Sequence, residues 1–189
     1  MATKINKRKN DHINICLEED VSYKKSAGFE NFNFLHNALP ELDFDQINTK
    51  TTFLGKKLSF PFIISAMTGG TDLGLKINKN LAMAAQSSKV ALGLGSARAA
   101  IEDEEQLSSF CVRAIAPDIP ILANLGAVQL NYGYGIKECQ KLVNDIKADA
   151  LVLHLNSLQE VIQGGNTNFG GLLKKIEKVI KEISCPVIV

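Results

Sequence analysis

Short apolar runs and longer amphipathic stretches alternate along the chain from residue 62 onward. Each short run is rich in Val, Ile and Leu, as in a strand that is buried on both faces. Each longer stretch has apolar positions three or four residues apart, which predicts a helix with one buried face. The predicted strands are 62–65, 90–92, 120–123, 150–154 and 186–189, and the predicted helices are 73–87, 104–115, 136–146 and 172–183. Strand starts roughly 30 residues apart have the spacing of βα units.

This alternation predicts a parallel sheet covered by helices, and two architectures are open. One is a (β/α)₈ TIM barrel, and the other is an open, doubly wound sheet. Polar groups follow each strand, where the catalytic loops of barrels lie, so the barrel is favoured. Four units and one strand amount to about half of a barrel of roughly 250 residues. We therefore predict an α/β fold that forms the N-terminal half of a TIM barrel, either as a fragment or in association with a second chain.

The first part of the chain lacks this rhythm. Residues 1–60 are predicted to form an N-terminal extension, and the barrel part is predicted to span 61–189. Residues 4–20 carry a weak helical pattern. Residues 21–45 are irregular, and their aromatic side chains are expected to pack onto a neighbouring element. A small hairpin is predicted next, with strands at 51–54 and 58–60 and a turn at 55–57.

Composition and charge exclude several classes of function. The chain has 189 residues, of which 46% are hydrophobic and 22% charged, as in an ordinary globular protein. Its formal net charge of +1 gives no reason to expect a nucleic-acid partner. No apolar run follows the basic N-terminal cluster or approaches the roughly 20 residues of a membrane span, so neither a signal peptide nor membrane insertion is expected. Four scattered cysteines indicate reduced thiols in a cytoplasmic protein rather than disulfides or a zinc site.

Candidate chemistry lies directly after four of the predicted strands. The four segments are Ser65–Gly70, Gly93–Arg98, Asn124–Gly126 and His154–Glu160. Their glycines let backbone N–H groups approach a planar ligand or a phosphate, and Ser96 and Arg98 are suited to binding an anion. Each segment alone has a structural explanation, such as a tight strand-to-helix turn. Because ligand-type groups follow four successive strands, a shared site explains them better. The second segment lacks the third glycine of a dinucleotide-binding fingerprint.

Five motifs together carry a family resemblance. They are Arg8-Lys9 with His12, Ala66-Met67-Thr68-Gly69-Gly70, Leu94-Gly95-Ser96-Ala97-Arg98, Ala123-Asn124-Leu125-Gly126 and His154-Leu155-Asn156-x-x-Gln159-Glu160. This set resembles the type 2 isopentenyl-diphosphate isomerases, which are FMN-dependent TIM-barrel enzymes. The resemblance runs with few gaps over essentially the whole chain. It implies the same fold and the same cofactor.

The resemblance also implies a ligand for each group of residues. The implied FMN contacts are Ala66, Met67, Thr68, Gly69, Ser96 and Asn124. The implied contacts to the substrate, its diphosphate or its hydrocarbon, are Arg8, Lys9, His12, Ser96, Arg98, His154, Asn156 and Gln159. Glu160 would bind Mg²⁺, which bridges to the diphosphate. The implied catalytic residues are Gln159 and His154.

The reaction of this family interconverts isopentenyl and dimethylallyl diphosphate and shifts a double bond without net redox change. An unactivated alkene needs a strong proton donor, and neither glutamine nor histidine is one. The resemblance therefore implies that reduced FMN does the acid/base work, while the protein supplies positioning and electrostatics. NADPH would serve as the reductant of the flavin. The resemblance further implies a cytoplasmic homo-oligomer, a tetramer or an octamer, that acts on a small-molecule diphosphate.

Two departures from the family pattern bear on these expectations. Asn166 stands where the family commonly has Asp, which changes the charge near the expected metal. The sequence reaches Val189 immediately before the family's Lys-Glu-Val-Gly motif and its phosphate-binding glycine loops. We therefore expect that this chain alone is inactive and does not bind FMN tightly. An inactive fragment or remnant of the enzyme, and another FMN-dependent TIM-barrel oxidoreductase such as a 2-hydroxyacid oxidase, stay open as alternatives.

Overall fold

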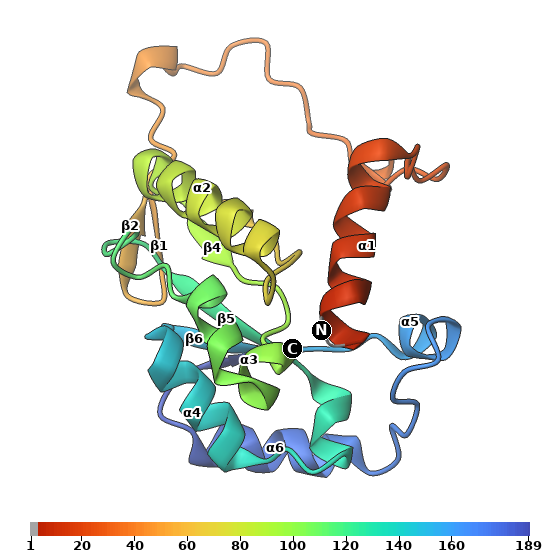
Figure 1. Ribbon diagram of the computed structural model, residues 1–189. Coiled ribbons are helices and arrows are strands. Elements are labelled where there is room, and N and C mark those ends of the chain that lie inside the picture. Colours follow the sequence, from red (N-terminus) through yellow and green to blue (C-terminus); the bar gives the residue numbers. More distant parts are fainter. Residues whose placement is uncertain (1–3) are drawn as a thin grey trace.

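A five-stranded parallel sheet forms the centre of the computed structural model, which describes residues 4–189 (Figure 1). Its strands are β3 (Ile63–Ile64), β4 (Ala91–Gly93), β5 (Ile121–Gly126), β6 (Ala150–His154) and β7 (Val187–Ile188). They pair in the order β3-β4-β5-β6-β7, so each strand lies beside the next one in the sequence. A doubly wound sheet reverses its strand order at a switch point, and this sheet does not. The predicted α/β class with a parallel sheet is confirmed.

Long helices connect the strands and cover the sheet. They are α2 (Asp72–Ser88), α4 (Ile136–Ile146) and α6 (Leu172–Glu182). Their apolar faces share one core with the strands, in which Ala85 of α2, Leu125 of β5, Ile146 of α4 and Leu153 of β6 are almost fully buried. Helices α4 and α6 contact each other (Figure 1). No helix within residues 4–189 is both long and apolar enough to cross a bilayer.

The register between β5 and β6 brings polar side chains from both strands to one face. Asn124 pairs with Val152, and Gly126 pairs with His154. Side chains alternate along a strand, while paired residues on neighbouring strands point to the same side of the sheet. Asn124 and His154 therefore share a face at the carboxyl ends of their strands.

The opposite, amino-terminal edge of the sheet is held by one carboxylate. Asp149 forms ion pairs with Arg113 and with Lys56 of β2 (Lys56–Leu58), and it accepts a hydrogen bond from the Ile121 backbone N–H at 2.7 Å. Burial raises the pKa of Asp149, but these three partners together hold it below its ordinary value. The cluster attaches the hairpin β1–β2 to the sheet, with β1 spanning Thr51–Phe53.

The N-terminal helix stands beside the sheet rather than on it (Figure 1). This helix, α1 (Lys4–Glu18), confirms the predicted helix over 4–20. Ile13 is 1% exposed and is the one buried side chain among residues 7–18. The connection from α1 to β1 arches away from the molecule and contains the short 3₁₀ turns η1 (Phe29–Asn31) and η2 (Phe44–Gln46).

Three predictions about local structure are wrong, and two of them concern residues 21–60. The aromatic side chains of the arching segment are not packed: Phe29, Phe32, Phe34 and Phe44 are 75% to 98% exposed, because no described element lies against them. The hairpin turn is tighter than predicted, so residues 56–57 belong to strand β2 and not to the turn.

The third wrong prediction is the helix over 104–115, where only residues 104–110 are helical and form the 3₁₀ helix η3 (Glu104–Phe110). A short helix that was not predicted, α3 (Arg98–Glu102), precedes it. Asp103 separates them, because its side chain accepts a hydrogen bond from the Glu105 backbone N–H and starts a new turn. The chain leaves the helical conformation at Cys111. Two further elements, η4 (Ala127–Asn131) and α5 (Ser157–Ile162), follow β5 and β6.

Candidate active site

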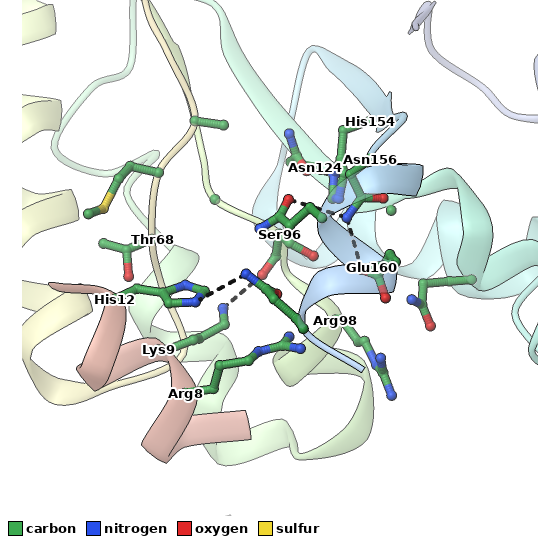
Figure 2. Close-up of a pocket in the computed structure, with 17 residues that line it drawn as sticks. Arg8, Lys9, His12, Thr68, Ser96, Arg98, Asn124, His154, Asn156 and Glu160 are labelled. Atoms are coloured by element: carbon green, nitrogen blue, oxygen red, sulfur yellow. Dashed lines mark hydrogen bonds between the residues drawn. The ribbon is translucent and has the colours of Figure 1, made fainter. Parts of the chain in front are cut away.

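A cavity of about 310 Å³ opens at the carboxyl ends of strands β3 to β6 and is covered on one side by α1 (Figure 2). The side chains come from every loop that follows these strands and from the N-terminal helix. The lining residues are Arg8, Lys9, His12, Ala66, Met67, Thr68, Gly95, Ser96, Arg98, Asn124, Gly126, Gln129, His154, Asn156, Gln159, Glu160 and Gln163. Because the strands pair side by side in sequence order, the four loops that follow them meet at this cavity.

A glycine in the loop after β4 allows the loop after β3 to lie directly against it. A Cβ atom on Gly95 would overlap the backbone atoms of Thr68. Thr68 itself is buried, whereas Met67 remains half exposed at the cavity. The loop of residues 66–68 therefore presents an apolar side chain and peptide groups to the cavity, a surface that suits a planar ring system.

His154 is held in one orientation by Asn124. The Nδ1 atom of His154 donates to Oδ1 of Asn124 at 2.7 Å, which leaves Nε2 as the acceptor nitrogen. Gly126 leaves room for the ring, since a Cβ atom there would lie 3.2 Å from Nε2. Burial lowers the pKa of His154, and the nearby Glu160 carboxylate raises it only in part. His154 is therefore neutral near pH 7 and is not a strong acid.

Glu160 is a buried carboxylate with two fixed partners. Its Oε1 accepts from Nδ2 of Asn156 at 2.9 Å, and its Oε2 accepts from the Asn166 backbone N–H at 2.6 Å. Gly165 leaves the space that this carboxylate occupies, because a Cβ atom there would overlap Oε2. The Asn166 side chain donates to Oε1 of Gln129 at 3.0 Å. Asn166 therefore contacts Glu160 through its backbone N–H only, while its side chain bonds to Gln129.

The cations of α1 enter the cavity from the side opposite the sheet (Figure 2). Nζ of Lys9 donates to the Ser96 backbone oxygen at 2.9 Å. Burial and, to a smaller extent, the adjacent Arg8 guanidinium lower the pKa of Lys9 to about 8. Nε of Arg8 is buried without a hydrogen-bond partner among the described residues. His12 accepts a hydrogen bond from the Gln163 amide at 3.4 Å, which links α1 to α5.

Arg98 is already part of an ion pair. Its Nε donates to Oε1 of Glu102 at 2.7 Å, and the Tyr134 hydroxyl donates to the same oxygen at 2.7 Å. Burial works against the charge of Arg98, but Glu102 raises its pKa above the ordinary value. The remaining guanidinium nitrogens of Arg98 have no partner among the hydrogen bonds of the described residues and are available to an anion.

The structure gathers nearly all the predicted site residues in this cavity. Gly69 is the exception: it is buried behind the lining, against the Phe110 ring. Sequence reasoning missed Gln129, Gln163, Gly95 and Gly126 as lining residues. Helical spacing from Gln159 would have pointed to Gln163, one turn further along the same face. Gln129 lies in η4, a segment that the sequence analysis left unassigned.

Two buried polar atoms without a hydrogen-bond partner among the described residues indicate which ligands fit the cavity. The unpartnered Nε of Arg8 is a hydrogen-bond donor and suits an anion such as a phosphate. The unpartnered Oδ1 of Asn156 is an acceptor beside the Glu160 carboxylate and suits a hydrated cation. No cluster of three or more His, Cys, Asp or Glu side chains suited to a metal occurs within residues 4–189. A metal at Glu160 therefore needs most of its ligands from water and a bound anion, which is how Mg²⁺ is commonly held.

Fold and site together define a class of protein: an α/β protein with a cavity, lined by basic and polar side chains, at the carboxyl edge of a parallel sheet. The chain belongs to the FMN-dependent dehydrogenase family, whose sequence profile matches residues 1–111.

The curated relatives of the chain share one narrower name. The chain is 52% identical to an isopentenyl-diphosphate delta-isomerase of Oceanobacillus iheyensis over 189 residues, which is 99% of this chain and 54% of that protein. It is 56% identical to the protein of the same name from Rickettsia rickettsii (strain Sheila Smith) over 183 residues, 96% of this chain and 54% of that protein. The chain spans about half the length of the curated relatives it matches.

Among solved structures, the universal stress protein from Archaeoglobus fulgidus in complex with dAMP aligns at 15% identity, with a TM-score of 0.23, over 68% of this chain and 96% of that chain.

Proposed function

We propose that this chain carries one part of the active site of an isopentenyl-diphosphate delta-isomerase. The observation that carries the proposal is the convergence of three α1 side chains with polar groups from four strand ends in a single cavity. Identity of 52% to 56% to proteins of that name supports this assignment over an inactive remnant. We also propose that the sheet is one half of a TIM barrel, because its strand order is sequential and its family is FMN-dependent.

The diphosphate of the substrate is assigned to the cationic side of the cavity. Arg8, with its unpartnered Nε, and Lys9 face it from α1, and Arg98 faces it from the loop after β4. Ionised donors in a partly buried site bind phosphate oxygens more strongly than neutral donors do. His12 completes this side. His154 is neutral with Nε2 as an acceptor, so it becomes a donor to the anion only if binding protonates it.

Mg²⁺ is assigned to Glu160, with the free Oδ1 of Asn156 as an acceptor for a metal-bound water. FMN is assigned to the loop of residues 66–68 together with Ser96 and Asn124, which face the cavity from the next two strand ends. Bound FMN, once reduced by NADPH, would supply the acid/base chemistry of the double-bond shift. Thr68 and Gly95, which pack closely against each other, would lie against the flavin ring.

The residues of this chain would orient the substrate and exclude water, and none of them is a strong proton donor. Gln159 stands at the cavity on α5, one residue before Glu160, and would contact the hydrocarbon that reacts. The hydrogen bond between Asn124 and His154 would keep the imidazole in place during the reaction.

The test is conversion of isopentenyl diphosphate to dimethylallyl diphosphate, followed by NMR, with the complete natural polypeptide, FMN, NADPH and Mg²⁺. Gln159→Ala should lower the turnover at least tenfold, whereas Lys137→Ala, at an exposed position of α4, should not change it. Full activity of Gln159→Ala would remove Gln159 from the catalytic set. Turnover of 2-hydroxy acids without isomerisation would favour an oxidoreductase, the broader activity of the family.

We also propose a cytoplasmic homo-oligomer, a tetramer or an octamer, as the functional form. The highly exposed aromatic side chains of residues 29–44 support this, because contact with a second subunit would bury them. Light scattering of the purified protein tests the proposal, and a monomer at micromolar concentration would contradict it.

A further inference from the structure

Phe110 is a fully buried residue at the end of η3, outside every motif that identified the site. Its ring nevertheless faces two parts of that site. The Nζ atom of Lys9 lies 5.2 Å from the centre of the ring. Three ring carbons also occupy the space that a side chain on Gly69 would need.

The neighbouring residue fixes the same loop from the same side. Oγ of Ser109 accepts a hydrogen bond from the Gly70 backbone N–H at 2.6 Å, and Gly70 has a positive φ of 78° that favours glycine. Asn78 of α2 donates to the backbone oxygens of Ser109 at 2.8 Å and of Thr68 at 3.3 Å. The turn at 68–70 is thus held against the end of η3 by hydrogen bonds and by the ring.

Lys9 contacts both the Phe110 ring and the loop after β4. Its ammonium group donates to the Ser96 backbone oxygen, and it forms no ion pair within residues 7–189. A buried ammonium without a carboxylate partner gains from the negative face of an aromatic ring. Gly70 also lies close to this group, since a Cβ atom there would stand 3.3 Å from Nζ.

We propose that Phe110 is a positioning residue of the anion site, which holds the Lys9 ammonium and the turn at 68–70 in a fixed relation to each other. This inference rests on the proposed function, in which Lys9 binds a phosphate group. Phe110 itself touches no ligand. It sets the place of the cation through its ring face and the place of the loop through its ring edge.

A double-mutant cycle with inorganic diphosphate as the probe tests the proposal. Phe110→Leu keeps an apolar side chain and removes the ring, and Lys9→Met removes the charge and keeps the stem. In the native background, Phe110→Leu should weaken diphosphate binding between about twofold and thirtyfold, the range for a cation–π contact. In the Lys9→Met background the same change should have no effect. Val112→Ala, which removes volume from the same core but offers no ring, is the control.

NMR titration of the Lys9 amine gives a second readout that needs no ligand. Loss of the ring should lower the pKa of Lys9 below about 8 in Phe110→Leu but not in Val112→Ala. If Phe110→Leu does not fold, a fluorinated phenylalanine at position 110 alone keeps the shape and weakens the negative ring face. Equal effects of the ring change with and without Lys9, and an unchanged Lys9 titration, would overturn the proposal. Absence of diphosphate binding by the native chain would contradict the proposed function instead, and the titration would still decide the role of Phe110.

Discussion

Replacing Lys9 with methionine should stabilise the folded chain at neutral pH, because the site holds an ammonium group where burial disfavours its charge. A pKa of about 8, against 10.5 for an unperturbed lysine, corresponds to roughly 3 kcal/mol between the charged and neutral forms. The hydrogen bond to the Ser96 oxygen offsets about 2 kcal/mol of that, as charge-assisted bonds do. The contact with the Phe110 ring offsets at least about 0.5 kcal/mol more. The net gain of Lys9→Met should therefore be no more than about 0.5 kcal/mol in the free energy of unfolding.

The gain should disappear as the pH rises, and the sign follows from proton binding. Above pH 8 the folded chain releases the Lys9 proton, while the unfolded chain keeps it up to about pH 10.5. The unfolded state then binds more protons, so the native chain becomes more stable with increasing pH in this window. Relative to Lys9→Met, the native chain should gain about 2 kcal/mol between roughly pH 7.5 and pH 9.5.

Urea unfolding followed by circular dichroism at both pH values measures these differences. Lys7→Met removes an exposed charge from the same helix and serves as the control. Inorganic diphosphate should stabilise the native chain and the Lys7 variant more than the Lys9 variant. Parallel pH profiles for the native chain and Lys9→Met, or a Lys9→Met chain that is clearly less stable at pH 7.5, would refute the reasoning.

Three further predictions concern other contacts. Gly165→Ala should displace the Glu160 carboxylate and weaken Mg²⁺ binding by about tenfold in the presence of diphosphate, as measured by calorimetry. Asp149→Asn removes the ion-pair partner of Arg113 and should cost about 2 kcal/mol of stability, so a change below roughly 0.5 kcal/mol in urea unfolding would contradict the structural role. Diphosphate affinity should increase as the pH falls toward 6 because binding favours protonated His154, whose pKa is lowered in the free chain. Substitution with glutamine should flatten that part of the profile, and an unchanged profile would exclude protonation of this residue.

Hydrophobic periodicity predicted the parallel sheet and most of its helices. The boundaries of α4 (Ile136–Ile146) and β6 (Ala150–His154) match the prediction residue for residue, because both carry regular patterns between clear turns. The helix predicted over 104–115 is wrong because residues 104–110 form a 3₁₀ helix and the chain leaves the helical conformation at Cys111. Apolar spacing alone does not distinguish a 3₁₀ helix from an α-helix over so few residues.

The polar side chains that line the site were easier to predict than the buried residues that hold them in place. Residues after strand ends stand out in the sequence as glycines, amides and charges, and almost all of those named from the sequence line the cavity. Phe110 does not stand out, because an apolar residue in an amphipathic segment looks like any other core residue. Its contact with Lys9 depends on how α1 docks against the sheet, and that arrangement leaves no pattern in the local sequence.

The buried side chain of Ile13 links the packing of α1 to the positions of its ligand-binding residues. Lys9, His12 and Ile13 lie three and four residues apart and therefore share one face of the helix. The first two reach into the cavity, and the third is the buried apolar anchor among the described side chains of α1. On the proposed function, recognition of the diphosphate would thus depend on this apolar contact together with the hydrogen bonds of Lys9 and His12. Shortening that isoleucine would lower the local concentration of positive charge at the strand ends while leaving every ligand-binding group chemically intact.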